Sequence, residues 1–385
     1  MWPIFLLVAF IVLAILVAAH WVIYLTLSAW LGFKNIWLAI GFLTAPLVFV
    51  LASIAGSRFN NWLTNIVYYV SAVWLGLVNF LLVASILLWL FWLVAKIFNF
   101  TLPTVALMIV FVSLSCLLVV YGIINTYQLK IKTYEVSLPN LPAVWQGRTA
   151  VWLSDLHLGQ IHKEAFSRRL TERVNALKPD IIFVGGDLFD GVAGDLSHLA
   201  APFKDLKAPL GVYFITGNHE EFNNPNIYLS VVKDLGMRVL ADESVEIDGV
   251  RLVGVNFHEG SNPGRLKQAI ALLGFNIHND KNQARFQTAF SQISDKSQPS
   301  ILLNHYPGNL EIANEFGINL QLSGHSHAGQ IWPANYITNL VYHGFDSGRH
   351  QYKDMTVITS NGAGTWGPPL RVGADPDILL IKFKN

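Results

Sequence analysis

Hydrophobic and polar positions divide this chain into two parts. Long apolar runs fill the first 130 positions, and short apolar runs alternate with polar segments from there to residue 385. A membrane-spanning helix needs about 20 predominantly apolar residues. Four runs reach that length, at residues 4–31, 36–55, 66–95 and 104–124, with short polar breaks between them. We therefore predict an N-terminal all-α transmembrane bundle of four helices, over residues 1–128.

The distribution of charge supports this division. All 25 acidic residues lie beyond residue 130, and His20 is the one ionisable side chain inside an apolar run. We expect His20 to form a hydrogen bond between helices or to lie at the membrane interface, and so few intramembrane ionisable groups argue against a transporter. A wholly water-soluble chain is excluded, which makes the lipid bilayer a partner. No basic stripe or tail is present, so we expect no nucleic-acid partner. The first 130 residues carry these charges: Lys34, Arg58, Lys96 and Lys130.

The basic residues flanking the runs also indicate an orientation. Four spans place both ends of the bundle on one side of the membrane. That side carries Arg58, Lys130 and Lys132, and the other side carries Lys34 and Lys96. The positive-inside rule then predicts a multi-pass protein of the cell membrane whose C-terminal part is cytoplasmic.

The second part of the chain has the pattern of an α/β domain. Residues 129–147, which contain two Leu-Pro pairs, are predicted to be a linker. From residue 148 to 385, short apolar strands alternate with helical stretches, as in α/β proteins. The helical stretches are expected at residues 163–177, 195–206, 263–273 and 283–293.

Potential metal ligands follow five of the predicted strands, at the carboxyl end of each. Ligands of α/β sheets gather beyond the carboxyl ends of the strands, so we expect these side chains to converge. The strands are 149–154, 181–184, 211–216, 300–304 and 318–323. The residues that follow them are, in order, Asp155 and His157, then Asp187, then Asn218 and His219, then His305, then His325 and His327.

The types of these residues indicate a pair of metal ions. The one cysteine, Cys116, lies in an apolar run, so a thiolate site is excluded. Imidazole, carboxylate and amide ligands suit Mn, Fe, Zn, Ni or Co. Seven donors are too many for one four-coordinate ion, but they fit two divalent ions about 3.5–4 Å apart that share a carboxylate. Asp187, central in the order and preceded by two glycines, is the natural bridge. The donors are Asp155, His157, Asp187, Asn218, His305, His325 and His327.

The order of these motifs resembles that of the calcineurin-like metallophosphoesterase superfamily, and most closely its membrane-associated bacterial branch. The family pattern is D-x-H, G-D-x-x-D, G-N-H-E/D, a lone H, and G-H-x-H. The matching segments here are 155–157, 186–190, 217–220, His305 and 324–327. The resemblance covers residues 148–385 and implies an αββα two-sheet sandwich.

The resemblance also implies how the residues share the two ions. One ion would be held by Asp155, His157, Asp187 and His327. The other would be held by Asp187, Asn218, His305 and His325. His219 would not ligate a metal but would face the phosphate. The branch often has Gly-Val-Asp-Asp where this chain has Gly254-Val255-Asn256-Phe257, so no substrate is carried over from it.

Two residues are catalytic candidates besides the ligands. We expect His219 to donate a proton to the phosphoryl or leaving oxygen, an effect worth about 10²–10⁴ in rate. Asp190 either orients His219 or a ligand histidine, or is a plain surface carboxylate.

The function expected from the sequence is that of a membrane-anchored phosphoric ester hydrolase with two divalent metal ions, for which manganese is one candidate. It would hydrolyse a phosphate mono- or diester, or a pyrophosphate, by metal-bound hydroxide. Four helices exceed what an anchor requires, so the substrate could be lipid-linked, such as a nucleotide-sugar lipid. The alternative is a catalytically inactive, metal-containing membrane module with a binding or regulatory role.

Overall fold

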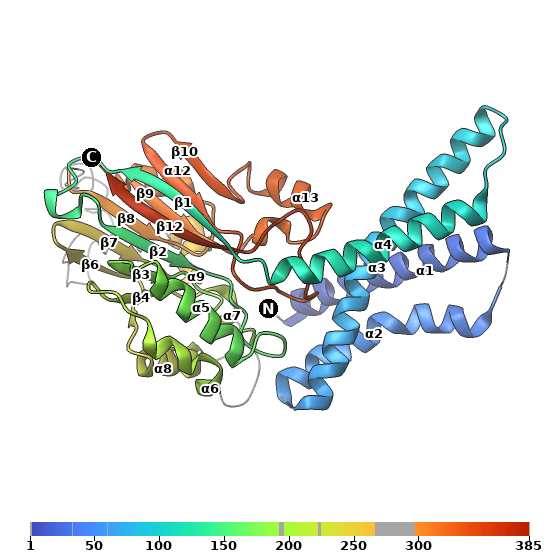
Figure 1. The fold of residues 1–385 in the computed structure, drawn as a ribbon, viewed down its shortest axis with the longest axis horizontal. Helices are drawn as coiled ribbons and strands as arrows, with labels where there is room; N and C mark the ends of the chain where they lie inside the picture. Colours follow the sequence, from blue (N-terminus) through green and yellow to red (C-terminus); the bar gives the residue numbers. More distant parts are fainter. Residues whose placement is uncertain are drawn as a thin grey trace. The chain divides into compact units, whose positions relative to one another are not determined.

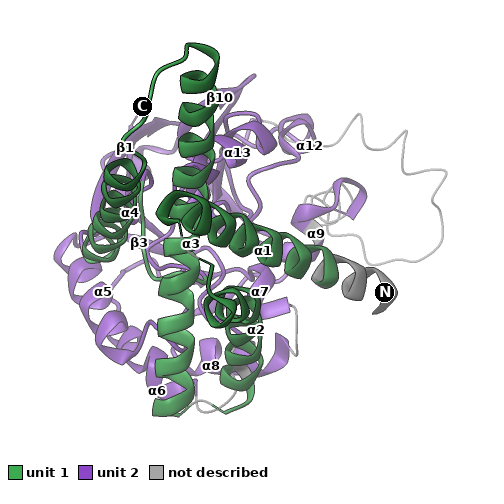
Figure 2. Cartoon of the chain, turned by 90° about the vertical axis from the view of Figure 1, so that its right-hand side faces the viewer, with its two compact units in different colours: residues 1–127, 367–372 green, residues 128–366, 373–385 purple. Residues whose placement is uncertain are grey.

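The chain forms two compact units in the computed structural model (Figure 2). The helical unit comprises residues 1–127 and 367–372, and the sheet unit comprises 128–366 and 373–385. The structure describes residues 2–32, 34–59, 61–191, 196–221, 225–265 and 297–384. The helix expected at 283–293 lies outside these residues, as does most of the one expected at 263–273.

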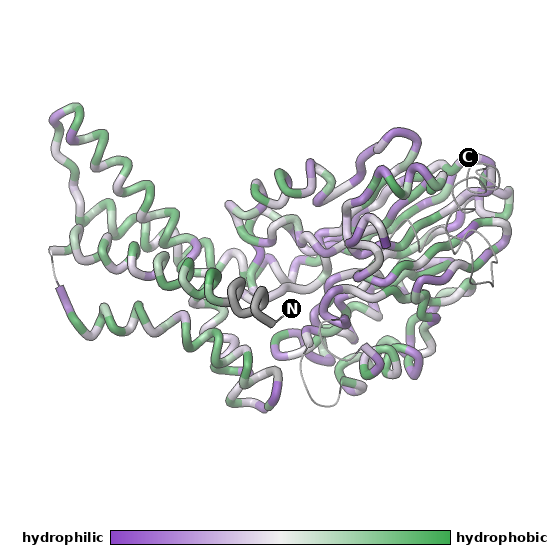
Figure 3. The backbone as a smooth tube through the Cα atoms, turned by 180° about the vertical axis from the view of Figure 1, so that it is seen from behind, coloured by the Kyte–Doolittle hydropathy of each residue, from purple (hydrophilic) through white to green (hydrophobic). Residues whose placement is uncertain are grey.

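The helical unit contains four long helices, which confirms the predicted all-α N-terminal part. All four are long and apolar enough to cross a membrane, and hydrophobic residues follow one another along their length (Figure 3). The helices are α1 (Trp2–Leu31), α2 (Ile36–Arg58), α3 (Trp62–Ile97) and α4 (Thr104–Thr126).

Packing between these helices combines apolar contacts with buried polar links. Ile23 of α1, Phe42 of α2 and Val78 of α3 belong to one buried cluster. The fully buried His20 accepts a hydrogen bond from Nε1 of Trp74, at 3.0 Å. This bond joins α1 to α3 and confirms that His20 links two helices.

A six-residue segment, Gly367–Val372, leaves the sheet unit and packs in the helical unit; we call it the strap. The backbone N–H of Arg371 donates to the carbonyl of Gly122 at 3.0 Å, and Nδ2 of Asn125 donates to the Arg371 carbonyl at 3.2 Å. Leu370 lies so close to Gly76 and Gly122 that a side chain at either glycine would overlap it. The strap therefore needs these two glycines on α3 and α4.

Within the residues that the structure describes, the sheet unit contains two six-stranded mixed sheets, layered as the predicted sandwich requires (Figure 1). One sheet has the order β1-β12-β2-β3-β4-β5 and the other has the order β10-β11-β9-β8-β7-β6. The strands of the first sheet are β1 (Lys130–Ser137), β2 (Thr149–Leu153), β3 (Ile181–Val184), β4 (Val212–Phe214), β5 (Arg238–Val239) and β12 (Asp377–Lys384). Those of the second are β6 (Glu243–Ile247), β7 (Val250–Gly254), β8 (Ser300–Leu303), β9 (Leu320–Ser323), β10 (Gly348–Tyr352) and β11 (Met355–Thr359).

Alternate residues of the central strands face two different cores, because successive side chains of a strand point to opposite faces. Trp152 and Phe183 pack with Leu303 of the other sheet, whereas Val151 and Ile182 pack with the helices outside the first sheet. A third cluster covers the outer face of the second sheet. The longer helices of this unit are α5 (Glu164–Ala176), α8 (Pro225–Asp234), α12 (Leu310–Glu315) and α13 (Ala334–Val341), and the short ones are α6 (Ser197–Ala200), α7 (Asn218–Glu221) and α9 (Phe257–Ser261).

Some elements differ from the sequence-based expectation. The segment expected as a linker contains β1, which pairs in parallel with β12 over eight residues. The helix expected at 195–206 is a single α turn, α6, followed by a 3₁₀ helix at Ala201–Asp205. Pro202 explains the change, because proline has no N–H to continue the α-helical bonding.

Candidate metal centre

The predicted ligands lie at the carboxyl ends of strands from both sheets. β2, β3 and β4 run parallel in the first sheet, and β8 and β9 run parallel in the second. Among the described residues, three overlapping groups of side chains have potential ligand atoms within 4.8 Å of one another. The groups are Asp155, His157 and His327; His157, Asp187 and His219; and Asp187, His305 and His325.

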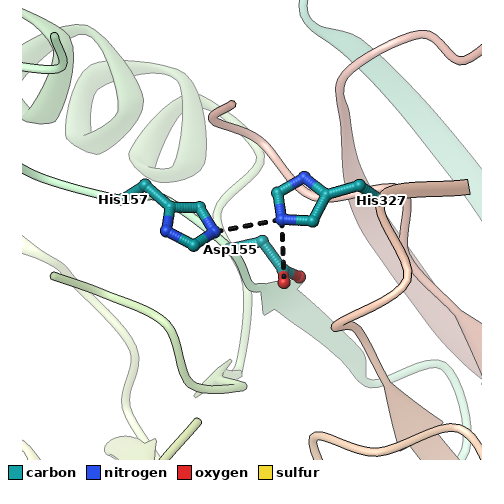
Figure 4. A group of neighbouring side chains, drawn as sticks. All are labelled: Asp155, His157 and His327. Atoms are coloured by element: carbon teal, nitrogen blue, oxygen red, sulfur yellow. Dashed lines mark hydrogen bonds and ion pairs between the residues drawn. The ribbon is translucent and has the colours of Figure 1, made fainter. Parts of the chain in front are cut away.

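In the first group, two imidazoles and one carboxylate point at one another (Figure 4). Nε2 of His157 lies 3.0 Å from Nε2 of His327, and the latter lies 3.5 Å from Oδ1 of Asp155. All three residues are buried. Convergence of two imidazole nitrogens and a carboxylate oxygen on one point is the arrangement that a divalent cation requires.

Asp187 belongs to the second and third groups and also lies near His157 of the first group. Its Oδ2 is 3.2 Å from Nε2 of His305 and 3.9 Å from Nε2 of His157. Its Oδ1 accepts a hydrogen bond from the backbone N–H of His219 at 2.9 Å. A carboxylate with histidines of both groups around it has the position that a bridge between two cations needs.

The predicted amide ligand, Asn218, lies beside the third group. Nδ1 of the fully buried His305 donates to the carbonyl of Gly185 at 2.6 Å, which turns Nε2 towards Asp187. Nδ1 of His325 lies 2.8 Å from Oδ1 of Asn218. Hydrogen bonding of the second ring nitrogen fixes which nitrogen is free to ligate.

The backbone at the ligands is strained. Five of the seven predicted ligands have the positive φ angles of left-handed backbone, which non-glycine residues seldom adopt. Such conformations cost of order 1–3 kcal/mol each and persist where the surrounding structure imposes them. The angles are 56° at Asp155, 50° at His157, 51° at Asp187, 69° at His325 and 50° at His327.

Two glycines make room for the carboxylates. A Cβ at Gly324 would overlap Oδ2 of Asp155, and one at Gly217 would overlap Oδ1 of Asp187. The donor set, of imidazoles, carboxylates and one amide without a thiolate, together with these two close approaches, fits a pair of divalent ions.

The charges of the buried side chains perturb one another strongly. Burial alone would lower the pKa of His305, but the carboxylates of Asp187 and Asp155 outweigh it and raise the pKa to about 10. Burial and the charge of His305 lower the pKa of His325 to about 3. Burial favours the neutral acid at Asp187, yet the neighbouring histidines hold its pKa below the usual value. The two buried carboxylates thus stabilise positive charge at this place.

Glu220 holds the backbone of two ligand loops by hydrogen bonds. The sequence did not predict this role, although the residue belongs to the motif at 217–220. Its fully buried carboxylate accepts hydrogen bonds from the backbone N–H groups of Asp187, Phe189 and Gly217, at 2.9, 3.1 and 2.8 Å. Burial and the charge of Asp187 raise the pKa of Glu220 to about 7. Glu220 therefore ties the loops after β3 and β4 together.

His219 and Asp190 lie beside the first group. Oδ1 of Asp190 is 3.2 Å from Nδ1 of His157 and 3.5 Å from Nδ1 of His219. The His219 ring is perpendicular to that of His157, with 4.7 Å between centroids. Asp190 can therefore orient both rings. Burial lowers the pKa of His219, which favours the neutral imidazole.

Aromatic side chains surround the ligand histidines, and no sequence signal distinguished them from the chain's many other aromatic residues. Phe257 and Tyr306 lie 5.2 and 6.0 Å from His325 between ring centroids, and Tyr342 lies 6.4 Å from it. Burial raises the pKa of Tyr342 to about 12. The exposed Trp366 lies 6.2 Å from His219. These rings place aromatic surface next to His325 and His219.

Comparisons with known proteins agree with this geometry. Residues 149–329 match the family model of the calcineurin-like phosphoesterases. An uncharacterised metallophosphoesterase of Campylobacter jejuni is 29% identical over 258 residues, which are 66% of this chain and 63% of that protein. A protein of Bos taurus named transmembrane protein with metallophosphoesterase domain is 32% identical over 294 residues, 72% of this chain and 62% of that protein. The chain thus spans less than two thirds of the length of these relatives. A solved dimetal phosphatase from Danio rerio is 12% identical, with a TM-score of 0.35 over 57% of this chain and 88% of that one.

Proposed function

We propose that this chain is a membrane-anchored, metal-dependent phosphoesterase, because residues 149–329 match the family model of the calcineurin-like phosphoesterases. It hydrolyses a phosphate mono- or diester, or a pyrophosphate. The observation that carries the proposal is the convergence of ligand side chains from five strand ends, in two sheets, on one buried cluster.

Seven residues would hold two divalent ions of Mn, Fe, Zn, Ni or Co. Asp187 would be shared, His157, Asp155 and His327 would complete one set, and the other set is Asn218, His305 and His325. When bound, such a pair of ions supplies a water of lowered pKa and binds the phosphoryl oxygens.

The chain's own contribution to the chemistry is proton transfer and orientation. The side chain of His219 is 14% exposed, so a phosphate can reach its ring. Its imidazole, in the protonated form that carries a hydrogen on both ring nitrogens, donates a hydrogen bond to the phosphoryl or leaving oxygen. Asp190, beside its Nδ1, holds the ring so that Nε2 faces the substrate.

Two substitutions test this division of roles. In detergent-purified full-length protein, Asp187→Ala is expected to lose bound metal, measured by mass spectrometry of the elements, together with hydrolysis of p-nitrophenyl phosphate esters. His219→Ala is expected to keep the metal and lose about 10²–10⁴ in rate. His258→Ala, which removes an exposed imidazole outside the three groups, is the matched control and should keep both properties.

Other outcomes would contradict the proposal. Full hydrolysis by a metal-free Asp187→Ala variant would exclude the two-metal site. Stoichiometric metal in the unsubstituted protein, without turnover of any ester or of a membrane lipid extract, would instead support the inactive binding or regulatory module.

Two further parts of the proposal concern the membrane. The substrate is a phosphate linked to a lipid, because the chain carries four apolar helices of spanning length. Loss of a phosphorylated species from a membrane lipid extract incubated with the protein tests this part.

The sheet unit faces the cytoplasm, since Arg58, Lys130 and Lys132 outnumber Lys34 and Lys96. Digestion of that unit by protease added outside intact spheroplasts would contradict this orientation and place the unit on the outer side of the membrane.

A further inference from the structure

Helix α13 of the sheet unit exposes an unusual amount of apolar surface. It has eight residues, Ala334–Val341, and none of them is buried. Four large apolar side chains lie on it: Tyr336 is 66% exposed, Ile337 63%, Leu340 76% and Val341 60%. The helix carries no charged residue. A contiguous exposed apolar surface of this kind marks a site of interaction.

The apolar residues form one stripe, and the opposite side of the helix is fixed. At 3.6 residues per turn, positions 336, 337, 340 and 341 share a face. On the other side, Oγ1 of Thr338 donates to Oδ2 of Asp346 at 3.1 Å, and Nδ2 of Asn339 donates to Oδ1 of the same residue at 2.9 Å. The carboxylate of Asp346 therefore holds the stripe outward.

The same contacts connect α13 to the candidate metal centre. Asp346 accepts a hydrogen bond from Oγ of Ser326, between His325 and His327, through its backbone carbonyl at 2.5 Å. Tyr342, directly after the helix, places its ring at 90° to that of His325. What covers the stripe will therefore lie near the metal-binding loop.

The connections between the two units indicate what covers the apolar stripe of α13. The chain passes between them three times, after residues 127, 366 and 372. Only three residues, Tyr127–Leu129, separate α4 from β1, and they can span at most about 11 Å. The sheet unit is thus confined to the surface of the bilayer that the four helices are long and apolar enough to cross.

We propose that the apolar stripe of α13 inserts into the boundary between headgroups and acyl chains of that bilayer. An uncharged helix with one apolar face and a fixed polar side fits such a position in the interface. The metal centre then opens at the lipid surface. Docking itself does not depend on the proposed phosphoesterase activity, since it is measured without turnover.

Fluorescence quenching by lipids tests the proposal on the full-length chain. The chain's one cysteine, Cys116, is replaced by serine, and Ile337→Cys or Leu340→Cys provides a single site for an environment-sensitive fluorophore. Each labelled variant is placed in nanodiscs, one chain per disc, with or without lipids brominated on their acyl chains. Ile227→Cys is the matched control, because Ile227 is an exposed isoleucine (52%) on helix α8 of the same unit. Equal metal content with the Cys116→Ser parent shows that each variant is folded.

The expected result is a loss of emission in brominated discs, several times larger at positions 337 and 340 than at 227. An equal loss of emission in brominated discs at all three positions would overturn the proposal. Blue-shifted emission at 337 and 340 without quenching by bromine would also overturn it, because protein would then cover the stripe. The same shift appearing only at several chains per disc would identify a second copy as the occupant.

Discussion

The carboxylate of Glu220 determines the shape of two ligand loops without reaching the place where cations would bind. It is the acceptor for three buried backbone N–H groups, of Asp187, Phe189 and Gly217. A buried N–H that loses its acceptor costs about 1–3 kcal/mol. Glu220 is therefore a positioning residue for Asp187.

Replacement of Glu220 by glutamine tests this role. Glu220→Gln keeps the shape but replaces one acceptor oxygen by an NH₂ group, which faces backbone donors. We expect a loss of about 1–3 kcal/mol in stability, seen as a lower thermal midpoint of the metal-free protein in detergent. Glu164→Gln, which alters an exposed pair with Arg168, should shift the midpoint little, because such pairs contribute about 0–1 kcal/mol. An equal shift of the thermal midpoint in both variants would contradict the positioning role of Glu220.

Gly324 offers a second prediction for a single residue. A methyl group there would overlap Oδ2 of Asp155 and Oγ of Ser154, so Gly324→Ala must displace the carboxylate. The expected result is weaker metal binding, measured by titration of the metal-free protein with Mn²⁺. Gly41→Ala is the control, because nothing lies within 4 Å of a Cβ at Gly41. Unchanged affinity in Gly324→Ala would show that Asp155 does not bind the metal with that oxygen.

The strap is the element that the sequence patterns did not reveal. Residues 367–372 contain no long apolar run, yet they pack in the helical unit because Gly76 and Gly122 leave space for Leu370. Trp366, the residue directly before the strap, bonds through its N–H and carbonyl to the side-chain amide of Gln330, at 2.9 and 3.0 Å. The strap thus begins directly after a residue that is held by hydrogen bonds and lies next to His219.

Substitution of Gly122 should release the strap. In Gly122→Leu the new side chain takes the space of Leu370 and Val372, and Arg371, fully buried in the intact protein, becomes accessible. We expect faster cleavage by trypsin after Arg371, followed by mass spectrometry of the fragments. Gly41→Leu introduces the same side chain on α2 without a clash and should leave the cleavage rate unchanged. Slow cleavage in both variants would mean that the strap is held by other contacts.

At the scale of the whole molecule, the four apolar helices predict integral membrane insertion. Each is long and apolar enough to cross a membrane, and a spanning helix inserts far more firmly than a surface-bound one. The full chain is therefore expected to stay in the membrane pellet after alkaline carbonate extraction and to enter the supernatant with detergent. Release by carbonate alone would show that the helices do not span the bilayer.

Prediction from sequence succeeded where a local pattern is sufficient. The apolar runs predicted α1 to α4, and the strands before Asp155, Asp187 and His305 were placed to within a few residues. It was less informative where pairing is non-local. β1 alternates polar and partly buried residues next to prolines, and it is a strand because β12, far along the chain, provides its hydrogen-bonding partner. The helix predicted at 195–206 is interrupted, because Pro202 has no N–H to continue the α-helical bonding after α6.

The sequence by itself determined the division into an apolar helical part and an α/β part, because long apolar runs, and short apolar runs that alternate with helical stretches, are local patterns. It also determined which donor types are present and that each follows a strand. Only the tertiary structure decided that Glu220 fastens two ligand loops, that the strap packs with α3 and α4, and that α13 turns its apolar side outward. Those features arise from contacts between segments distant in sequence, whose distances and available space no linear pattern contains.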